Sequence, residues 1–397
     1  MLAKRLALSL LFCHAACQLG QGSGAFDKDP NATNPDGSTP SVGTAQQPAT
    51  APTGSSATPV TVRYLGRVNE ATKALTWSGS GVEAGFSGTG GTATFSSTGS
   101  STSVIGVSVD GGAMTKAEVS GTVQVPFSAS GSGNHVVRFI KLNEAELGSV
   151  TFGGLTLSGG KAASFTPPSR RLEFIGDSIT VGYGIEGNAP CTNNARMENV
   201  AKSWAFLTAQ SLQADVSVIA WSGHGILRNG VSVNDTVLMP AIWPRLSASD
   251  ATSKYDFASA PQPDAVVINL GTNDYTYLTY TAGQASPGRA QLDQTAFVAA
   301  YKSFVQQVRS AYPNALIVLT QSPMLTDTYP TATEKQWSAL GDNVAAVISA
   351  LGDNNITSLA LPTQDTTSTG CDGHPDAGEQ QAMATALTPL LKQKLGW

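Results

Sequence analysis

The chain has 397 residues, of which 41% are hydrophobic and only 13% are charged, and its formal net charge is −5. This length predicts two or three domains, and the apolar share is ample for a buried core. The charge is mild and no basic block or stripe appears, which argues against nucleic acid as a partner.

The first 59 residues are predicted to form an export signal and a tether. In residues 1–17, two basic residues precede an apolar run at 6–16 that is too short to span a bilayer. Small residues then precede Cys17, which we expect to be the lipidated first residue of a bacterial lipoprotein. Simple secretion is the alternative, because His14 stands where an aliphatic residue is usual. Residues 18–59 are poor in large apolar side chains and predict a flexible linker.

Residues 60–168 predict a β-sandwich, because short β-type runs alternate with Gly/Ser turns and no helical period appears. The predicted strands are Val60–Tyr64, Thr76–Trp77, Val82–Phe86, Gly91–Phe95, Val104–Val109, Val123–Phe127, His135–Lys141 and Leu147–Leu157. A carbohydrate-binding face is one option for this domain. Trp77 and His135 could line such a face, although core or turn packing is the interpretation we favour for both.

Residues 169–397 follow a Pro-Pro boundary and alternate between apolar strands and amphipathic helices. The predicted strands are Leu172–Ile175, Val216–Ala220, Ala265–Leu270, Ala315–Thr320 and Ile356–Leu361, and the predicted helices are Asn199–Leu212, Asp293–Ala311, a helix opened by a Thr331/Glu334 capping box, and 377–395. This alternation predicts a parallel sheet covered by helices on both faces. A site is expected at the carboxyl ends of its strands.

Four loops that follow these strands contain the parts of an acyl-transfer site. They are Gly176–Ser178, Trp221–Gly225, Gly271–Asp274 and Gly370–Pro375. A serine just past a buried strand is a common position for a nucleophile, so Ser178 is the candidate. The backbone N–H groups of Ser178 and Gly223, with the Asn273 amide, are candidates for an oxyanion hole. Asp274 is expected to brace its own loop.

The serine hydroxyl needs an adjacent base, and His374 is the best candidate because it lies in the loop after the last strand. His224, beside the expected oxyanion loop, is its one rival. Asp372 is the nearest carboxylate, two residues before His374. Either that carboxylate or a backbone carbonyl of the loop can support the histidine.

Cys191 and Cys371 are the two cysteines outside the signal region. In an exported protein such a pair favours one disulfide, which would join the loop after the nucleophile to the histidine loop. Two buried free thiols are the alternative. No group of Cys, His and carboxylate residues has metal-ligand spacing, and the proposed chemistry needs neither a metal nor a cofactor.

These motifs resemble a known superfamily, the SGNH hydrolases. Gly176–Thr180 is a GDS(L)-type motif, and the blocks around Ser178, Gly223, Asn273 and His374 stand in the family's order. Gly-Tyr-Gly after the serine block, Cys-Asp-Gly-His-Pro at 371–375 and a β-rich domain in front are similar to carbohydrate esterase family 2. The resemblance implies a flavodoxin-like three-layer parallel-sheet domain preceded by a jelly-roll β-sandwich. In family 2 the Asp-x-His spacing is usual.

The resemblance implies a serine esterase that removes O-acetyl groups from polysaccharides such as xylan or mannan. The expected partner is therefore an acetylated polysaccharide or oligosaccharide, and a monomer is expected. Two alternatives stay open. One is an SGNH lipase or lysophospholipase, although no long apolar loop suits an acyl chain. The other is a carbohydrate-binding lipoprotein with a vestigial esterase site.

Overall fold

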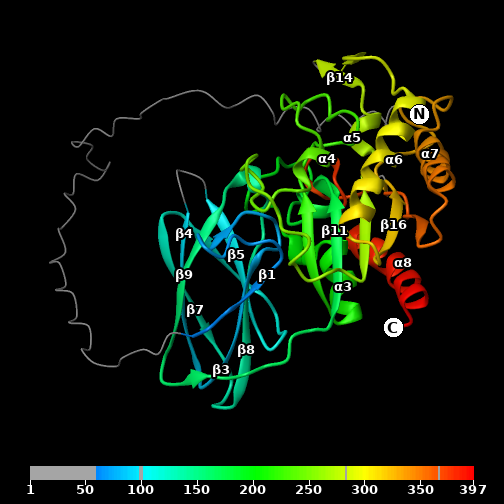
Figure 1. The fold of residues 1–397 in the computed structure, drawn as a ribbon. Coiled ribbons are helices and arrows are strands. Elements are labelled where there is room, and N and C mark those ends of the chain that lie inside the picture. Colours follow the sequence, from blue (N-terminus) through cyan, green and yellow to red (C-terminus); the bar gives the residue numbers. More distant parts are fainter. Residues whose placement is uncertain (1–59, 98–101, 282–283, 365–366) are drawn as a thin grey trace, which may run out of the picture.

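The computed structural model describes residues 60–97, 102–281, 284–364 and 367–397 (Figure 1). The predicted signal, Cys17 and the predicted linker lie outside the described residues. The described chain forms a two-sheet β-sandwich that packs beside a larger α/β unit. In the described residues no helix has the length and apolar character needed to cross a membrane.

The sandwich consists of antiparallel strands in the sheet orders β1-β3-β8-β5-β6, with β10 beside β3, and β2-β9-β4-β7. Its elements are β1 (Arg63–Leu65), β2 (Ala74–Leu75), β3 (Gly81–Ser87), β4 (Gly90–Ser97), β5 (Ser103–Val109), β6 (Thr115–Val119), β7 (Thr122–Ser128), β8 (Asn134–Lys141), η1 (Ala145–Leu147), β9 (Val150–Leu157) and β10 (Lys161–Ala162). Phe86, Phe95 and Phe139 are fully buried between the two sheets. This pairing of apolar inner faces confirms the predicted sandwich.

Several sandwich elements differ from prediction, and the short strand β10 is one that was not predicted. The predicted strand at Thr76–Trp77 is wrong, because β2 ends at Leu75 and Trp77 turns away into a core that it shares with the α/β unit. The Trp77 indole N–H donates to the Leu246 carbonyl at 3.0 Å. Strand β6 was not predicted, because it is a mostly exposed edge strand of polar and charged residues.

The α/β unit has a five-stranded parallel sheet in the order β12-β11-β13-β16-β17. Its elements are β11 (Arg170–Gly176), α2 (Ser178–Val181), η2 (Val200–Lys202), α3 (Trp204–Leu212), β12 (Ala214–Ala220), α4 (Met239–Ile242), β13 (Ala265–Asn269), α5 (Thr272–Tyr275), the hairpin β14 (Leu278–Thr281) and β15 (Gln284–Pro287), α6 (Gln294–Ala311), β16 (Leu316–Gln321), α7 (Gln336–Leu351), β17 (Ile356–Ala360), η3 (Cys371–Gly373) and α8 (Ala377–Leu395). In order of appearance the sheet reads 2-1-3-4-5, the flavodoxin-like arrangement. Its switch point lies between β11 and β13, where ligands bind in such folds.

Helices cover both faces of this sheet, as predicted (Figure 1). Phe174 of β11 packs in the core that includes the buried faces of α3 and α8. Its neighbour Ile175 points to the opposite face and packs in the core that includes α6 and α7. Successive side chains of a strand alternate between faces, so one apolar strand supplies both cores.

The predicted capping box of Thr331 and Glu334 is wrong. Helix α7 begins at Gln336, with Lys335 as the N-cap, and the Thr331 hydroxyl donates to the Glu334 carboxylate at 3.1 Å. A capping box is present instead at α8, where the Asp376 side chain accepts from backbone N–H groups of the first turn. That cap fixes the start of the helix that follows the histidine loop.

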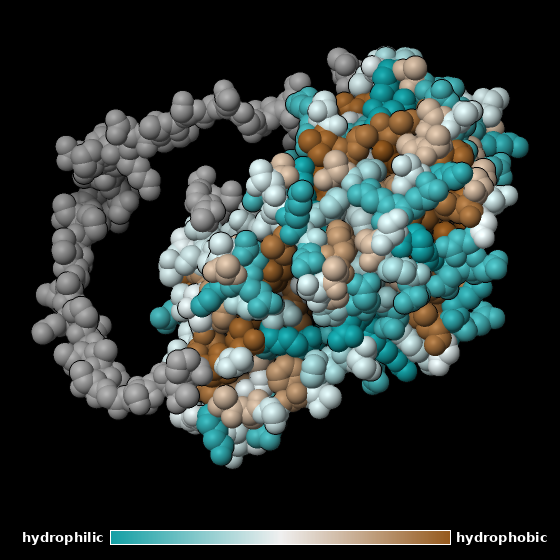
Figure 2. Space-filling view, in the orientation of Figure 1, coloured by the Kyte–Doolittle hydropathy of each residue, from teal (hydrophilic) through white to brown (hydrophobic). Residues whose placement is uncertain are grey.

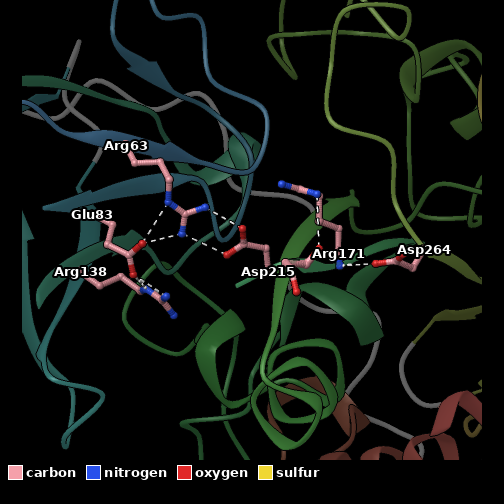
Figure 3. A network of polar contacts seen from close by, with 7 residues as sticks. Arg63, Glu83, Arg138, Arg171, Asp215 and Asp264 are labelled. Atoms are coloured by element: carbon pink, nitrogen blue, oxygen red, sulfur yellow. Dashed lines mark hydrogen bonds and ion pairs between the residues drawn. The ribbon is translucent and has the colours of Figure 1, made fainter. Parts of the chain in front are cut away.

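The two units meet through ion pairs. Arg63 of β1 contacts Glu83 of β3 and reaches Asp215 of the α/β unit at 2.6 Å, while Arg138 also donates to Glu83 (Figure 3). Deeper in the interface, fully buried Arg67 pairs with Glu173 of β11 at 3.0 Å. A buried pair of this kind adds little net stability, because the cost of removing both charges from water offsets much of their attraction. On the face shown in Figure 2, apolar residues lie in separate patches among polar ones.

Candidate active site

Ser178 lies directly after β11, on the first turn of α2. Its backbone is set by Asp177, whose Oδ1 accepts from the Ile179 N–H at 3.1 Å and caps the turn. The Ser178 Oγ lies 2.9 Å from Nε2 of His374, which follows η3. The structure thus brings together two residues that are 196 positions apart in the sequence and that were predicted as nucleophile and base.

His374 is only 8% exposed, and burial lowers its pKa to about 4. The charge of Asp372 and the nearby backbone carbonyls of Asp372 and Cys371 oppose this effect. The Tyr183 ring packs on the imidazole, with 4.1 Å between ring centroids. The histidine is therefore neutral near pH 7, which is the state a general base needs.

Asp372 lies beside the histidine, but its carboxylate is bound to other groups. Oδ2 accepts from the Tyr183 hydroxyl at 3.0 Å and from the Asn193 N–H at 2.9 Å. Among the described residues, no hydrogen bond of ordinary geometry reaches Nδ1 of His374. The Asp372 charge therefore acts on the imidazole from a distance, and membership of a triad stays a prediction.

A disulfide joins Cys191 to Cys371, 180 positions further along the chain. Two backbone hydrogen bonds accompany it, from the Cys371 N–H to the Gly184 carbonyl and from the Asp372 N–H to the Cys191 carbonyl, both at 3.1 Å. Gly184 has a φ of +65°, and a Cβ there would lie 2.7 Å from the Cys371 nitrogen. Only glycine fits this close approach of the two loops.

Gly223 and Asn273 meet across a neighbouring loop. Gly223 has a φ of +77°, and a Cβ there would lie 2.3 Å from the Val233 side chain. The Asn273 amide donates to Asp177 Oδ2 at 3.2 Å and to the His224 carbonyl at 3.1 Å. Both residues flank Gly230, whose N–H donates to the Gly223 carbonyl at 2.7 Å. Through its hydrogen bond to Asp177, the Asn273 amide is linked to the residue that precedes Ser178.

Two buried aspartates hold these loops. Burial raises the pKa of Asp177 to about 7 and that of Asp274 to about 6. The Asp274 carboxylate accepts from the N–H groups of Leu227 at 2.7 Å and Arg228 at 3.0 Å. The prediction that Asp274 braces its own loop is wrong, because it braces the loop after β12. It therefore supports the region that contains Gly223.

His224, the rival candidate for the base, contacts groups other than Ser178. Its Nδ1 lies 2.9 Å from the Ser222 carbonyl and its Nε2 lies 3.3 Å from Asp235. Both ring nitrogens are thus engaged away from Ser178, and the ring lies 5.4 Å from that of Trp221. Of the two histidines near the site, the geometry favours His374 as the base.

Sequence reasoning missed several residues that hold the site. Gln380 of α8 donates to the Ile179 carbonyl at 2.9 Å and accepts from the Trp204 N–H at 2.8 Å, so it joins three helices beside the nucleophile. Its signal was a glutamine at a buried position of an amphipathic helix. Glu144 and Asn193 gave no such signal, because Ser222, the partner of the Glu144 carboxylate, and Asp372, a partner of Asn193, lie 78 and 179 positions away in the sequence.

A groove of about 1270 Å³ lies between the two units, away from these residues. Arg171 and Leu172, at the amino end of β11, are part of its lining, whereas Ser178 and His374 are not. The candidate site lies at the opposite, carboxyl end of the sheet. In the described residues, no cluster of three or more His, Cys, Asp or Glu side chains could hold a metal ion.

A flavodoxin-like sheet with a serine–histidine pair at its switch point defines a serine acyl hydrolase. The comparisons agree, since residues 174–380 match the GDSL-like lipase/acylhydrolase family and residues 64–168 match the carbohydrate esterase 2 N-terminal domain. The chain belongs to the GDSL-like acylhydrolases and, within them, to carbohydrate esterase family 2. It is a carboxylic ester hydrolase.

Relatives with both units are known. Cellulase/esterase CelE of Acetivibrio thermocellus is 35% identical over 81% of this chain, which spans only 38% of that protein. An acetylxylan esterase / glucomannan deacetylase of Cellvibrio japonicus is 30% identical over 68% of this chain and 70% of its own. A solved family 2 esterase from Corynascus thermopiles is 38% identical, with a TM-score of 0.76 over 85% of this chain and 100% of that one.

Proposed function

We propose that this protein is a serine esterase that removes O-acetyl groups from polysaccharides such as xylan or mannan through an acetyl-enzyme. The observation that carries the proposal is the 2.9 Å contact between Ser178 Oγ and Nε2 of a neutral, buried His374. That contact lies on a scaffold whose relatives include enzymes named acetylxylan esterase and glucomannan deacetylase.

In the first step, His374 Nε2 takes the Ser178 proton while Oγ bonds to the acetyl carbonyl carbon. The carbonyl electron pair moves to oxygen, and the N–H groups of Ser178 and Gly223 and the Asn273 amide hold that oxyanion. Both N–H groups of the Asn273 amide are already engaged, so one of them must be shared with the oxyanion.

Collapse of this intermediate breaks the bond to the sugar oxygen, which takes the proton from His374 and leaves as a hydroxyl. Water then gives a proton to His374 and adds to the acetyl carbon. A second collapse returns the His374 proton to Ser178 and releases acetic acid, which loses its proton to water as acetate. In both half-reactions the negative charge of Asp372 stabilises the His374 imidazolium. In this proposal Asp372 is a third member of the catalytic site, with a weaker effect than the Asp of an ordinary triad.

Substitution of Ser178 by Ala tests the proposal. The variant should keep its fold by circular dichroism and lose acetate release from acetylated xylan and glucomannan. Wild-type turnover by pure, folded Ser178→Ala would remove Ser178 as the nucleophile. A series of p-nitrophenyl esters from acetate to long chains separates the alternatives: a preference for long chains supports a lipase, and no hydrolysis by the wild type supports a carbohydrate binder.

We also propose that the chain is exported, anchored through a lipid on Cys17, and active as a monomer. The basic start, the short apolar run and the small residues before Cys17 support the anchor. Fractionation of cells that express the full chain or Cys17→Ser tests it, with loss of membrane association expected for the variant. Light scattering of the soluble part tests the monomer.

A further inference from the structure

The segment after β8 leaves the sandwich and enters the α/β unit. Leu142 packs in a core of the α/β unit, and its carbonyl accepts from the Val200 N–H at 3.1 Å. Buried Lys141 holds the next turn, because its Nζ donates to the Glu144 carbonyl at 3.0 Å. Glu144 is only 2% exposed, so this segment places a carboxylate of the sandwich inside the neighbouring unit.

The Glu144 carboxylate meets the loop that contains Gly223. Its Oε2 accepts from the Ser222 N–H at 2.8 Å. Ser222 directly precedes Gly223, whose N–H belongs to the expected oxyanion hole. A peptide bond joins Ser222 to Gly223. Fixing the Ser222 nitrogen therefore restricts where the Gly223 N–H can lie.

A second contact connects Glu144 to the histidine side. The Glu144 N–H donates to Oε2 of buried Glu198 at 2.7 Å, and Glu198 Oε1 accepts from the Asn193 side chain at 2.7 Å. The Asn193 N–H in turn donates to Asp372. Burial and the adjacent Glu144 carboxyl raise the pKa of Glu198 well above its usual value.

We propose that Glu144, a residue of the β-sandwich, is a positioning residue for the oxyanion loop of the catalytic unit. The inference rests on the proposed esterase function, in which the Gly223 N–H stabilises the transition state. Gly223 stands at a positive φ, and the peptide that carries its N–H follows directly on the Ser222 nitrogen that Glu144 holds. An anchor on its neighbour therefore decides whether the N–H points at the oxyanion, and small errors in such placement cost catalysis heavily. A residue of the sandwich thus helps to complete the active site of the α/β unit.

The test compares two substitutions of similar size. Glu144→Met fills the same space but cannot accept the Ser222 N–H, whereas Glu144→Gln keeps an acceptor oxygen. We expect Glu144→Met to lose about 10- to 100-fold in kcat with little change in KM, and Glu144→Gln to stay within about threefold of wild type. Methylboronic acid, which forms a tetrahedral adduct on an active serine, should bind Glu144→Met more weakly by a similar factor.

The matched control is Glu118→Ala. It removes an exposed ion pair between the units, Glu118 with Arg196 at 2.5 Å, that does not touch the oxyanion loop. We expect its kcat and boronate affinity to equal those of the wild type.

If Glu144→Met does not fold, Glu144→Asp replaces it. The shorter side chain keeps the charge but draws the carboxylate back from Ser222, and the same loss of kcat is expected. Folded Glu144→Met or Glu144→Asp with wild-type kcat and boronate affinity overturns the inference. Failure of the wild type to hydrolyse any acetyl ester overturns the proposed function instead, so the two failures are distinguishable.

Discussion

The two loops that complete the active site are held in different ways. The histidine loop, residues 370–375, is attached within its own unit by the disulfide to Cys191 and two backbone hydrogen bonds. The oxyanion loop, residues 221–225, has no covalent tie among the described residues, and its Ser222 N–H depends on Glu144 of the other unit. The proposed base is thus placed by a crosslink and the proposed oxyanion hole by a buried hydrogen-bond network.

This difference follows from what each loop must do. In the proposed mechanism His374 exchanges protons twice per turnover and has to stay against Ser178, and a crosslink restricts its loop. The oxyanion loop must present an N–H group, and buried N–H groups are held most accurately by fixed acceptors. Variants of the two loops should therefore fail in separable ways.

Loss of the base gives the largest expected effect. His374→Ala leaves Ser178 without a proton acceptor, and we expect a loss of about 10⁴-fold or more in kcat/KM on an acetyl ester. Binding of a non-hydrolysable xylo-oligosaccharide, measured by calorimetry, should change little. A loss of less than tenfold would show that another group takes the Ser178 proton and would remove the histidine loop from the comparison.

Loss of the oxyanion donor should cost less. Asn273→Ala removes one donor, and such a donor is worth about 10²- to 10³-fold in kcat. Because Asn273 also binds Asp177, the melting temperature must be measured on the same sample. An unchanged kcat in the folded variant would mean that the backbone N–H groups alone hold the oxyanion. The oxyanion would then be held by the Ser178 N–H and by the Gly223 N–H of the loop that Glu144 positions.

The sequence predicted the α/β unit better than the sandwich, for a physical reason. Buried parallel strands are nearly continuous apolar runs, so the central strands β11, β13 and β16 could be recognised directly. An exposed edge strand such as β6 has no such pattern. Trp77 was placed in a strand because its character suited one, but its partner is the Leu246 carbonyl of the other unit. Contacts between units are not encoded in local periodicity.

The same limit applies to the site. Ser178 and His374 were predictable, because each follows a recognisable strand and the carboxyl ends of parallel strands meet at one edge. The direction of the Asp372 carboxylate was not, since it depends on Tyr183 and Asn193, which converge only in the folded chain. Glu144 gave no signal of its own in the sequence. Its role depends on the packing of two units.

Substitution of Asp372 tests how the histidine loop supports its proposed base. Asn suits the left-handed φ of +55° at this position, so Asp372→Asn removes the charge without backbone strain. We expect a loss of about ten- to a thousand-fold in kcat/KM, less than for His374→Ala. If the two variants are equally inactive, the site is an ordinary triad and the observed carboxylate direction is not the working one.

The pH profile gives that variant a second, independent readout. In the wild type the acid limb of kcat/KM should lie well below pH 6.5, because burial lowers the pKa of His374 to about 4 and activity falls only as the base is protonated. The Asp372 charge raises this pKa, so Asp372→Asn should shift the acid limb to still lower pH. A shift to higher pH would contradict this assignment of the charge.

The smallest expected effect on activity, and a large one on stability, comes from the disulfide. The double variant Cys191→Ser/Cys371→Ser opens a loop of 180 residues, worth about 5 kcal/mol of unfolding free energy in the chain-entropy treatment. At 25 °C, kcat should fall only a few-fold, because the Gly184 and Cys191 carbonyls still accept from the histidine loop. Methylboronic acid affinity should fall no more than kcat, since the oxyanion loop has its own anchor. If the double variant instead loses boronate affinity as strongly as Glu144→Met, the crosslink also positions the oxyanion loop, and the two loops are not held independently.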